Sequence, residues 1–95
     1  MNNVHLSSAS NPTRDECIQW LNQQLACEYE AMVAFIAYSQ MLKRTPYHRI
    51  VRELERHAAE DYRHAENIIK QIHDLGGKTC VQLNIDKMAD LLLSA

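Results

Sequence analysis

The chain contains two long stretches in which apolar residues recur with helical spacing. Between Thr13 and Lys43, and again between Tyr47 and Leu75, no glycine or proline interrupts the pattern. This spacing predicts two α-helices of about 30 residues, each roughly 45 Å long at about 1.5 Å per residue. A T-x-x-E capping box formed by Thr13 and Glu16 predicts where the first helix begins.

Short breaking segments separate and end these helices. Thr45 and Pro46 predict a turn between them, with Thr45 capping the second helix and Pro46 in its first turn. Gly76 and Gly77 predict the end of the second helix. Because so short a turn reverses the chain, we expect the two helices to form an antiparallel hairpin. A last short helix is expected from Asp86 onward.

The composition fits an all-α fold and excludes a many-stranded β protein, because the 95 residues include only 2 Gly and 2 Pro. Residues 1–12 are rich in Asn and Ser, and we expect them to be a flexible N-terminal tail. A single helical domain is expected over residues 13–95. A chain of this length has a small core, so we expect a metal or oligomerisation to reinforce it.

Charge and hydropathy exclude further classes of function. A formal net charge of −2 leaves no basic excess for nucleic-acid binding. No apolar run approaches the roughly 18 residues that a membrane-spanning helix needs. The three cysteines form no C-x-x-C pair, and we expect them to be small buried residues. Because the N-terminus carries no signal-peptide pattern, we expect a cytoplasmic location.

The first predicted helix has two apolar stripes. The first stripe, at heptad spacing, comprises Ile18, Leu21, Leu25, Glu28, Met32, Phe35, Ser39 and Leu42. The second stripe, about 100° further round the helix, comprises Trp20, Gln24, Cys27, Ala31, Ala34, Tyr38 and Met41. One hairpin partner covers only one stripe, which favours a bundle of at least four helices built from two or more chains. The alternative is one broad, well-buried face.

The second predicted helix carries ionisable residues in the middle of its apolar stripe. This stripe comprises Tyr47, Ile50, Leu54, His57, Asp61, His64, Ile68, Gln71 and Leu75, and near its end the apolar register drifts to Ile72. His57, Asp61 and His64 occupy three consecutive positions at its centre. When the hairpin is folded about residues 44–45, facing positions sum to roughly 89, so Glu28 lies level with Asp61.

These buried ionisable groups need a compensating partner, because a carboxylate in an apolar stripe costs several kcal/mol when it is unpaired. A polar layer that fixes helix register is one explanation, and a metal site is the other. Asp61 and His64, spaced i, i+3, project toward one point with Glu28 facing them. We favour a metal site of Glu28, Asp61 and His64, with His57 one turn away. A second copy of the chain would double this small ligand set.

Two motifs resemble those of known iron proteins. The segment LNQQLACEYEA resembles the first-helix motif of bacterioferritins, with Glu28 at the position of the iron-binding Glu. The segment DYRHAE, which contains Asp61 and His64, resembles the second-helix E-x-x-H motif of the ferritin-like superfamily. The resemblance covers about residues 16–85, which is most of the chain.

Three features depart from the bacterioferritin pattern. The third and fourth helices are missing, so the chain is similar to the small encapsulated ferritins, whose two-helix protomers pair around an interfacial di-iron site. The second motif has Asp61 in place of Glu, and this side chain is one methylene shorter. Tyr62 stands where bacterioferritin has a haem-ligating Met, so no haem is expected.

The resemblance implies an iron-binding protein in which two chains complete a four-helix ferritin-like bundle. Glu28, Asp61 and His64 would be the metal ligands and the catalytic residues of a ferroxidase that oxidises Fe(II) at a di-iron site with oxygen or peroxide. Manganese or zinc would be surrogates for iron. The resemblance leaves three roles open for His57: a partner of a ligand, a ligand on the path of metal entry, or a core residue.

The resemblance also implies partners. The expected partner is a second copy of the chain in a homodimer, and such dimers are expected to assemble into a ring. An encapsulin shell is a further expected partner, which gives an encapsulin compartment as a second location. The chain end from Asp90 to Ala95 does not resemble the Gly-Ser-Leu tail that directs cargo into such shells. The alternative function is a metal-free helical oligomer with a vestigial site, acting as a structural or interaction module.

Overall fold

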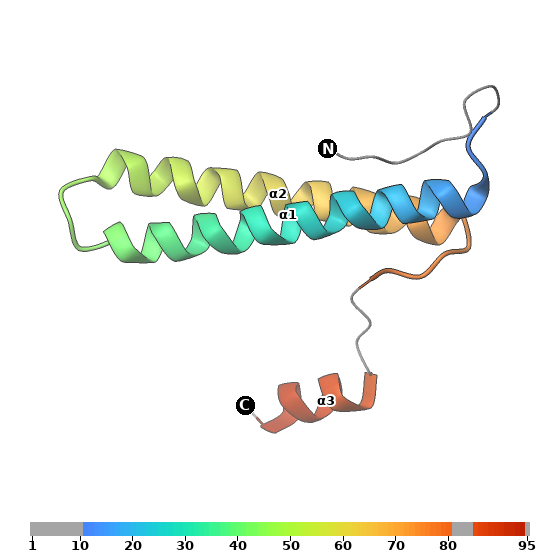
Figure 1. The fold of residues 1–95 in the computed structure, drawn as a ribbon. Coiled ribbons are helices and arrows are strands. Elements are labelled where there is room, and N and C mark those ends of the chain that lie inside the picture. Colours follow the sequence, from blue (N-terminus) through green and yellow to red (C-terminus); the bar gives the residue numbers. More distant parts are fainter. Residues whose placement is uncertain (1–10, 81–84, 95) are drawn as a thin grey trace.

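The computed structural model of the chain describes residues 11–80 and 85–94. Within these ranges it contains three helices and no strand: α1 (Arg14–Leu42), α2 (His48–Asp74) and α3 (Ile85–Ser94). Figure 1 shows α1 and α2 side by side and antiparallel, joined by a tight turn, with α3 apart from them. The predicted all-α class, the helical hairpin and the short last helix are therefore confirmed.

The start of α1 follows the predicted capping box. The hydroxyl of Thr13 accepts a hydrogen bond from the Glu16 amide at 3.1 Å, and the Glu16 carboxylate accepts one from the Thr13 amide at 2.8 Å. These two bonds satisfy amide groups that the first helical turn leaves without partners.

The start of α2 differs from the prediction. Tyr47 is its N-cap, and within the described residues no side chain caps this helix end. The Thr45 hydroxyl and amide both donate to the Leu42 carbonyl at the end of α1, at 2.7 and 3.0 Å. The same hydroxyl accepts a hydrogen bond from the amide of Tyr47 at 3.3 Å, so Thr45 joins the end of α1 to the start of α2. Pro46 consequently lies outside α2, which begins at His48.

The end of α2 is a Schellman motif, as the glycine pair predicts. Gly76 has a φ of 75°, its amide donates to the His73 carbonyl at 2.8 Å, and the Gly77 amide donates to the Ile72 carbonyl at 2.9 Å. Glycine reaches this left-handed conformation without the steric cost that a Cβ imposes.

The open end of the hairpin, opposite the turn, is held together across α1 and α2. The Arg14 guanidinium donates hydrogen bonds to the carbonyls of Leu75 and Gly76. Gly77 packs so closely on Ile18 that a Cβ there would lie 2.8 Å from the Ile18 Cδ1. Glycine is required at this position by the close approach of the segment after α2 to Ile18 of α1.

The segment after α2 runs back along α1. The Asn22 side-chain amide donates to the Lys78 carbonyl at 2.9 Å, and its oxygen accepts from the Cys80 amide at 2.7 Å. These two bonds hold residues 78–80 beside the first half of α1.

The buried core of the hairpin confirms the first stripe of α1 and corrects that of α2. Leu21, Leu25 and Ser39 of the predicted first stripe are buried. In α2 the buried residues recur every seventh position: Val51, Ala58, Ala65 and Ile72. The first three each lie one residue after a position of the predicted stripe, whereas Ile72 agrees with the expected drift of the register. The prediction followed heptad spacing, whereas the buried residues lie at the edge of that stripe, where the small side chains of Ala58 and Ala65 let the two helices approach closely.

The predicted stripe of α2 is therefore half right. Leu54, Asp61 and Ile68 are partly buried in the hairpin, whereas Ile50 and His57 are exposed. Leu25 and Ile72 are fully buried at the centre of the core, and burying each such side chain contributes about 1.5–3 kcal/mol.

In the described part of the chain, no helix is both long enough and apolar enough to cross a membrane. Of the predicted N-terminal tail, residues 1–10 lie outside the described residues, so that prediction stays a prediction.

Candidate metal centre

Glu28 and Asp61 lie at the middle of the hairpin. Glu28 is the central residue of α1, with fourteen helical residues on each side, and Asp61 is the central residue of α2, with thirteen on each side. The ligand atoms of Glu28, Asp61 and His64 all lie within 4.8 Å of one another. The structure thus brings together three of the four residues that the sequence singled out.

The imidazole of His64 faces both carboxylates. Its Nδ1 lies 3.3 Å from Glu28 Oε1 and 3.8 Å from Asp61 Oδ1. Asp61 and His64 are one turn apart on α2, so both project toward α1 at the same level. A nitrogen and two carboxylate groups therefore converge from two helices.

The site is buried on one side and open on the other. The side chain of Asp61 is only 15% exposed and that of Glu28 is 24% exposed, whereas that of His64 is 58% exposed. The carboxylates thus lie within the hairpin and the imidazole lies at its surface. We call the side of the hairpin on which His64 is exposed the open face.

One oxygen of the site has no partner within the described residues. Asp61 Oδ2 is buried and accepts no hydrogen bond. Leaving a buried carboxylate oxygen without a donor costs free energy, because the oxygen has lost its hydrogen bonds to water and has formed none with the protein. A cation at this point would compensate it, so the residues present fit a metal ion.

The donor set indicates the class of metal. An imidazole nitrogen with carboxylate oxygens suits iron, manganese or zinc, whereas calcium and magnesium prefer oxygen ligands alone. One chain supplies three candidate ligands, and a metal ion held by them would have coordination positions open on the side toward solvent. Open positions are what a substrate ion or an oxidant needs in order to approach.

His57 does not belong to this group. Its ring stacks on Phe35, with centroids 5.3 Å apart and planes 28° apart, and its Nδ1 lies 3.4 Å from Glu60 Oε1. The prediction overlooked Phe35 and Glu60 as neighbours of His57. A signal for Phe35 was present, since 35 and 57 sum to roughly the value expected for facing positions in a hairpin with this turn.

The charged side chains on the outside of α2 form local ion pairs. Arg56 contacts Glu53 at 2.6 Å and Glu60 at 2.9 Å, at i, i+3 and i, i+4 spacing. The hydrogen bond from Arg56 and its positive charge lower the pKa of the Glu53 carboxyl from its usual value. The bond to Glu53 correspondingly raises the pKa of Arg56.

The second predicted stripe of α1 is largely uncovered in a single hairpin. Trp20, Tyr38 and Met41 on this stripe are exposed by 46%, 54% and 71%. On a helical wheel the stripe adjoins Glu28 and lies on the side of the open face. The prediction that one hairpin covers only one stripe of α1 is therefore confirmed.

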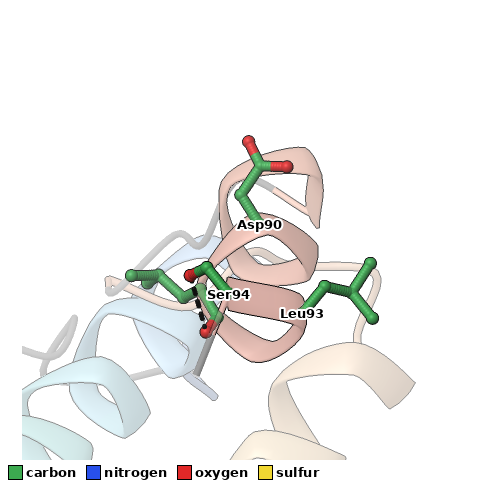
Figure 2. A pocket seen from close by; sticks show the side chains of 4 residues that line it. Asp90, Leu93 and Ser94 are labelled. Carbon is green, nitrogen blue, oxygen red and sulfur yellow. Dashed lines mark hydrogen bonds between the residues drawn. The ribbon is translucent and has the colours of Figure 1, made fainter.

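Two hollows in the described surface lie away from Glu28, Asp61 and His64. One, of about 250 Å³, is lined by Pro12, Glu16, Cys17 and Trp20 near the start of α1. The other, of about 420 Å³, is lined by Asp90, Leu91, Leu93 and Ser94 of α3. Figure 2 shows Asp90 and Leu93 on different sides of this short helix, so the second hollow is an open surface and not an enclosed pocket.

Comparison with known proteins gives one match. Residues 18–90 match the family model described as the ferritin-like domain. No curated protein and no solved structure matches the chain.

Proposed function

This chain belongs to the ferritin-like domain family, and from that membership we propose that it binds ferrous iron at Glu28, Asp61 and His64 and oxidises it. The observation that carries the proposal is the convergence of three ligand atoms within 4.8 Å around a buried, unpartnered carboxylate oxygen. A polar layer that only fixed register would satisfy its own hydrogen bonds. Here Asp61 Oδ2 accepts no hydrogen bond within the described residues, and a bound cation would compensate its charge.

Each side chain has a distinct part in this proposal. Glu28 and Asp61 supply the negative charge that holds the ferrous ions and favours the ferric state. His64 supplies a neutral nitrogen, and its exposure places it where an incoming ion first meets the site. Buried Leu21, Leu25 and Ala65 belong to the adjoining apolar core, which limits the access of water from within the hairpin.

The oxidation balances with dioxygen or peroxide as the oxidant. Two ferrous ions lose one electron each and become ferric. Dioxygen accepts these two electrons and two protons to give hydrogen peroxide, whereas peroxide accepts them with two protons to give two water molecules. The protein contributes the placement of the ions and the charge that compensates the ferric product.

A second copy of the chain completes the site in this proposal. Two copies would supply two each of Glu28, Asp61 and His64, which approaches the ligand set of a di-iron helical bundle. The uncovered stripe through Trp20 and Tyr38 supports pairing through the open face. Because the site lies at the middle of both helices, a two-fold axis through it would overlap two hairpins along their full length.

The wider assembly and location remain predictions. A ring of such dimers, an encapsulin shell and an encapsulin compartment follow from the resemblance to bacterioferritins and encapsulated ferritins, whereas a cytoplasmic location was expected from the N-terminal sequence. The division of the chain into a tail over residues 1–12 and one helical domain over residues 13–95 also remains a prediction.

Anaerobic titration with Fe(II), followed by a measured amount of oxygen or peroxide, tests the proposed function. Wild type should bind ferrous iron and form ferric iron faster than buffer does, whereas E28Q and H64A should lose both. H73A is the matched control, because His73 is exposed near the end of α2, away from the site. If wild type and H64A bound iron equally, the alternative of a metal-free oligomer with a vestigial site would be preferred.

A further inference from the structure

The start and the end of α1 have surfaces of opposite shape. Near the start, the hollow of about 250 Å³ exposes an apolar lining and is formed by Pro12, Glu16, Cys17 and Trp20. Near the end, Tyr38 and Met41 are exposed by 54% and 71% and project from the helix. We call the first surface the α1 hollow and the second the α1 knob. Exposed apolar surfaces that are grouped in this way are typical of a contact with another protein chain.

The α1 hollow and the α1 knob lie on the same face of the helix. Trp20 and Tyr38 are 18 residues apart, which is five full turns, so their side chains leave α1 in the same direction. Along the helix axis the two residues are about 27 Å apart. Both belong to the second stripe of α1, which lies on the side of the open face. A partner that covers the open face therefore meets both surfaces at once.

The second stripe is nearly symmetric about the metal centre. Trp20 and Tyr38 lie nine residues on either side of position 29, which directly follows Glu28. Cys17 in the α1 hollow and Met41 in the α1 knob lie twelve residues on either side of the same position. A two-fold axis across the hairpin at this level therefore brings the hollow of each copy opposite the knob of the other. The stripe between hollow and knob has mostly small side chains: Gln24, Cys27, Ala31 and Ala34.

The side chains of α2 favour this direction of the axis. Glu53 and Glu60 lie within about 40° of His64 on a helical wheel, so α2 is polar on the side of the open face. An axis along the hairpin would set the apolar stripe of α1 on this polar side of the partner's α2, and burying charged groups against apolar ones costs free energy. An axis across the hairpin sets α1 against α1 and α2 against α2, so apolar surface covers apolar surface.

From these observations we propose that the α1 helices of two copies pack antiparallel, with Tyr38 and Met41 of each copy in the α1 hollow of the other, beside Trp20. The inference rests on the proposed pairing of two chains at the metal site, and it names the surface and the register of that pairing. The small side chains at the middle of the stripe let the two helices approach closely. The aromatic contacts at both ends fix the register, because a slip of one helical turn would shift one ligand set about 5 Å from the other.

A disulfide between Cys17 of one copy and a cysteine introduced by M41C in the other tests this register. The two positions are about 36 Å apart along one α1 helix, so the bond can form only between copies. Mild oxidation of Mn(II)-loaded M41C with diamide should give a covalent pair, in which peptide mass spectrometry finds this link. C17S/M41C should lose the link. The control Q40C, at the neighbouring exposed position of α1, should form no link to Cys17.

A double-mutant cycle tests the aromatic contact. W20A and Y38A should each raise the pair dissociation constant of the Mn(II)-loaded chain at least about tenfold in sedimentation equilibrium. The two residues can touch only across the pair, so the effect of W20A/Y38A should be at least about threefold smaller than the product of the single effects. Both are half-exposed in one hairpin, so the variants should remain folded. V33A, which truncates an exposed side chain on another face of α1, should leave the constant unchanged.

Three results would overturn the inference. A link to Cys17 that formed equally in M41C and Q40C, or single effects of W20A and Y38A that multiplied in the double variant, would contradict the register. If the wild type nevertheless paired and bound iron in the anaerobic titration, the proposed function would stand with a different contact surface. A wild-type chain that stayed monomeric when loaded would overturn both the pairing and the register.

Discussion

His64 Nδ1 lies 3.3 Å from Glu28 Oε1, although 36 residues separate the two in the chain. The contact joins the middle of α2 to the middle of α1, with Asp61 beside it. Nothing in the packing of the hairpin requires ionisable groups there, since buried alanine and leucine form the adjoining core. The proposed role of these residues in holding iron leads to two predictions about metal binding, and the packing and capping of the hairpin lead to two more about stability.

Metal should stabilise the folded chain through His64. At a free metal concentration of about 100 times the dissociation constant, the free energy of unfolding should rise by about 2.7 kcal/mol. Thermal unfolding with Mn(II) or Zn(II) should show this as a rise in Tm for wild type and for H73A. The rise should be absent in H64A, and an equal rise in H64A would mean that the metal binds elsewhere.

Asp61→Asn should separate stability from metal binding. Without metal, Asp61 and Glu28 place two carboxylates close together, and Asp61 Oδ2 has no donor within the described residues. Removing one charge should therefore leave the metal-free Tm equal to that of wild type or higher. With Mn(II), the wild type should gain stability and D61N should not. A large loss of stability of D61N in EDTA would indicate that the carboxylate serves packing.

Gly77→Ala should destabilise the open end of the hairpin. The added Cβ would lie 2.8 Å from Ile18 Cδ1, so the free energy of unfolding should fall by about 1–3 kcal/mol in urea titrations. In an I18A background the same substitution should cost clearly less, because the clashing side chain is gone. Equal costs in both backgrounds would contradict the close approach of Gly77 to Ile18.

Thr13→Ala should weaken the start of α1. The substitution removes the hydroxyl that accepts a hydrogen bond from the Glu16 amide. Loss of such a cap lowers the free energy of unfolding by about 1 kcal/mol. Urea unfolding measures this change. Gln19→Ala, at an exposed position within the same helix, serves as the control and should change stability little. A similar cost for both variants would show that the capping box contributes nothing specific.

The middle of the hairpin was predictable from the sequence because its geometry is local. Two uninterrupted helices and one tight turn fix which positions face each other, so Glu28 and Asp61 could be placed at one level by counting. The spacing of Asp61 and His64 added the third group. Both long helices, the capping box and the glycine stop followed from equally local signals.

The errors arose where packing, and not periodicity, decides. Ala58 and Ala65 are buried because small side chains let α1 approach, but the stripe drawn at heptad spacing lies one residue before each of them. Thr45 was expected to cap α2 alone, but its hydroxyl donates to Leu42 at the end of α1 and accepts from the amide of Tyr47, the N-cap of α2. His57 lies on the predicted stripe of α2, but its ring contacts Phe35 and Glu60. It does not join the group of Glu28, Asp61 and His64.

The central claim is that Glu28, Asp61 and His64 bind iron, and a crystal soaked anaerobically with Fe(II) tests it most directly. An anomalous difference map at the iron absorption edge should show a strong peak among these three side chains, with ligand atoms about 2.1 Å from it. The proposed pairing places that peak at a two-fold axis between two chains. A map with peaks elsewhere and none among these residues would contradict the claim.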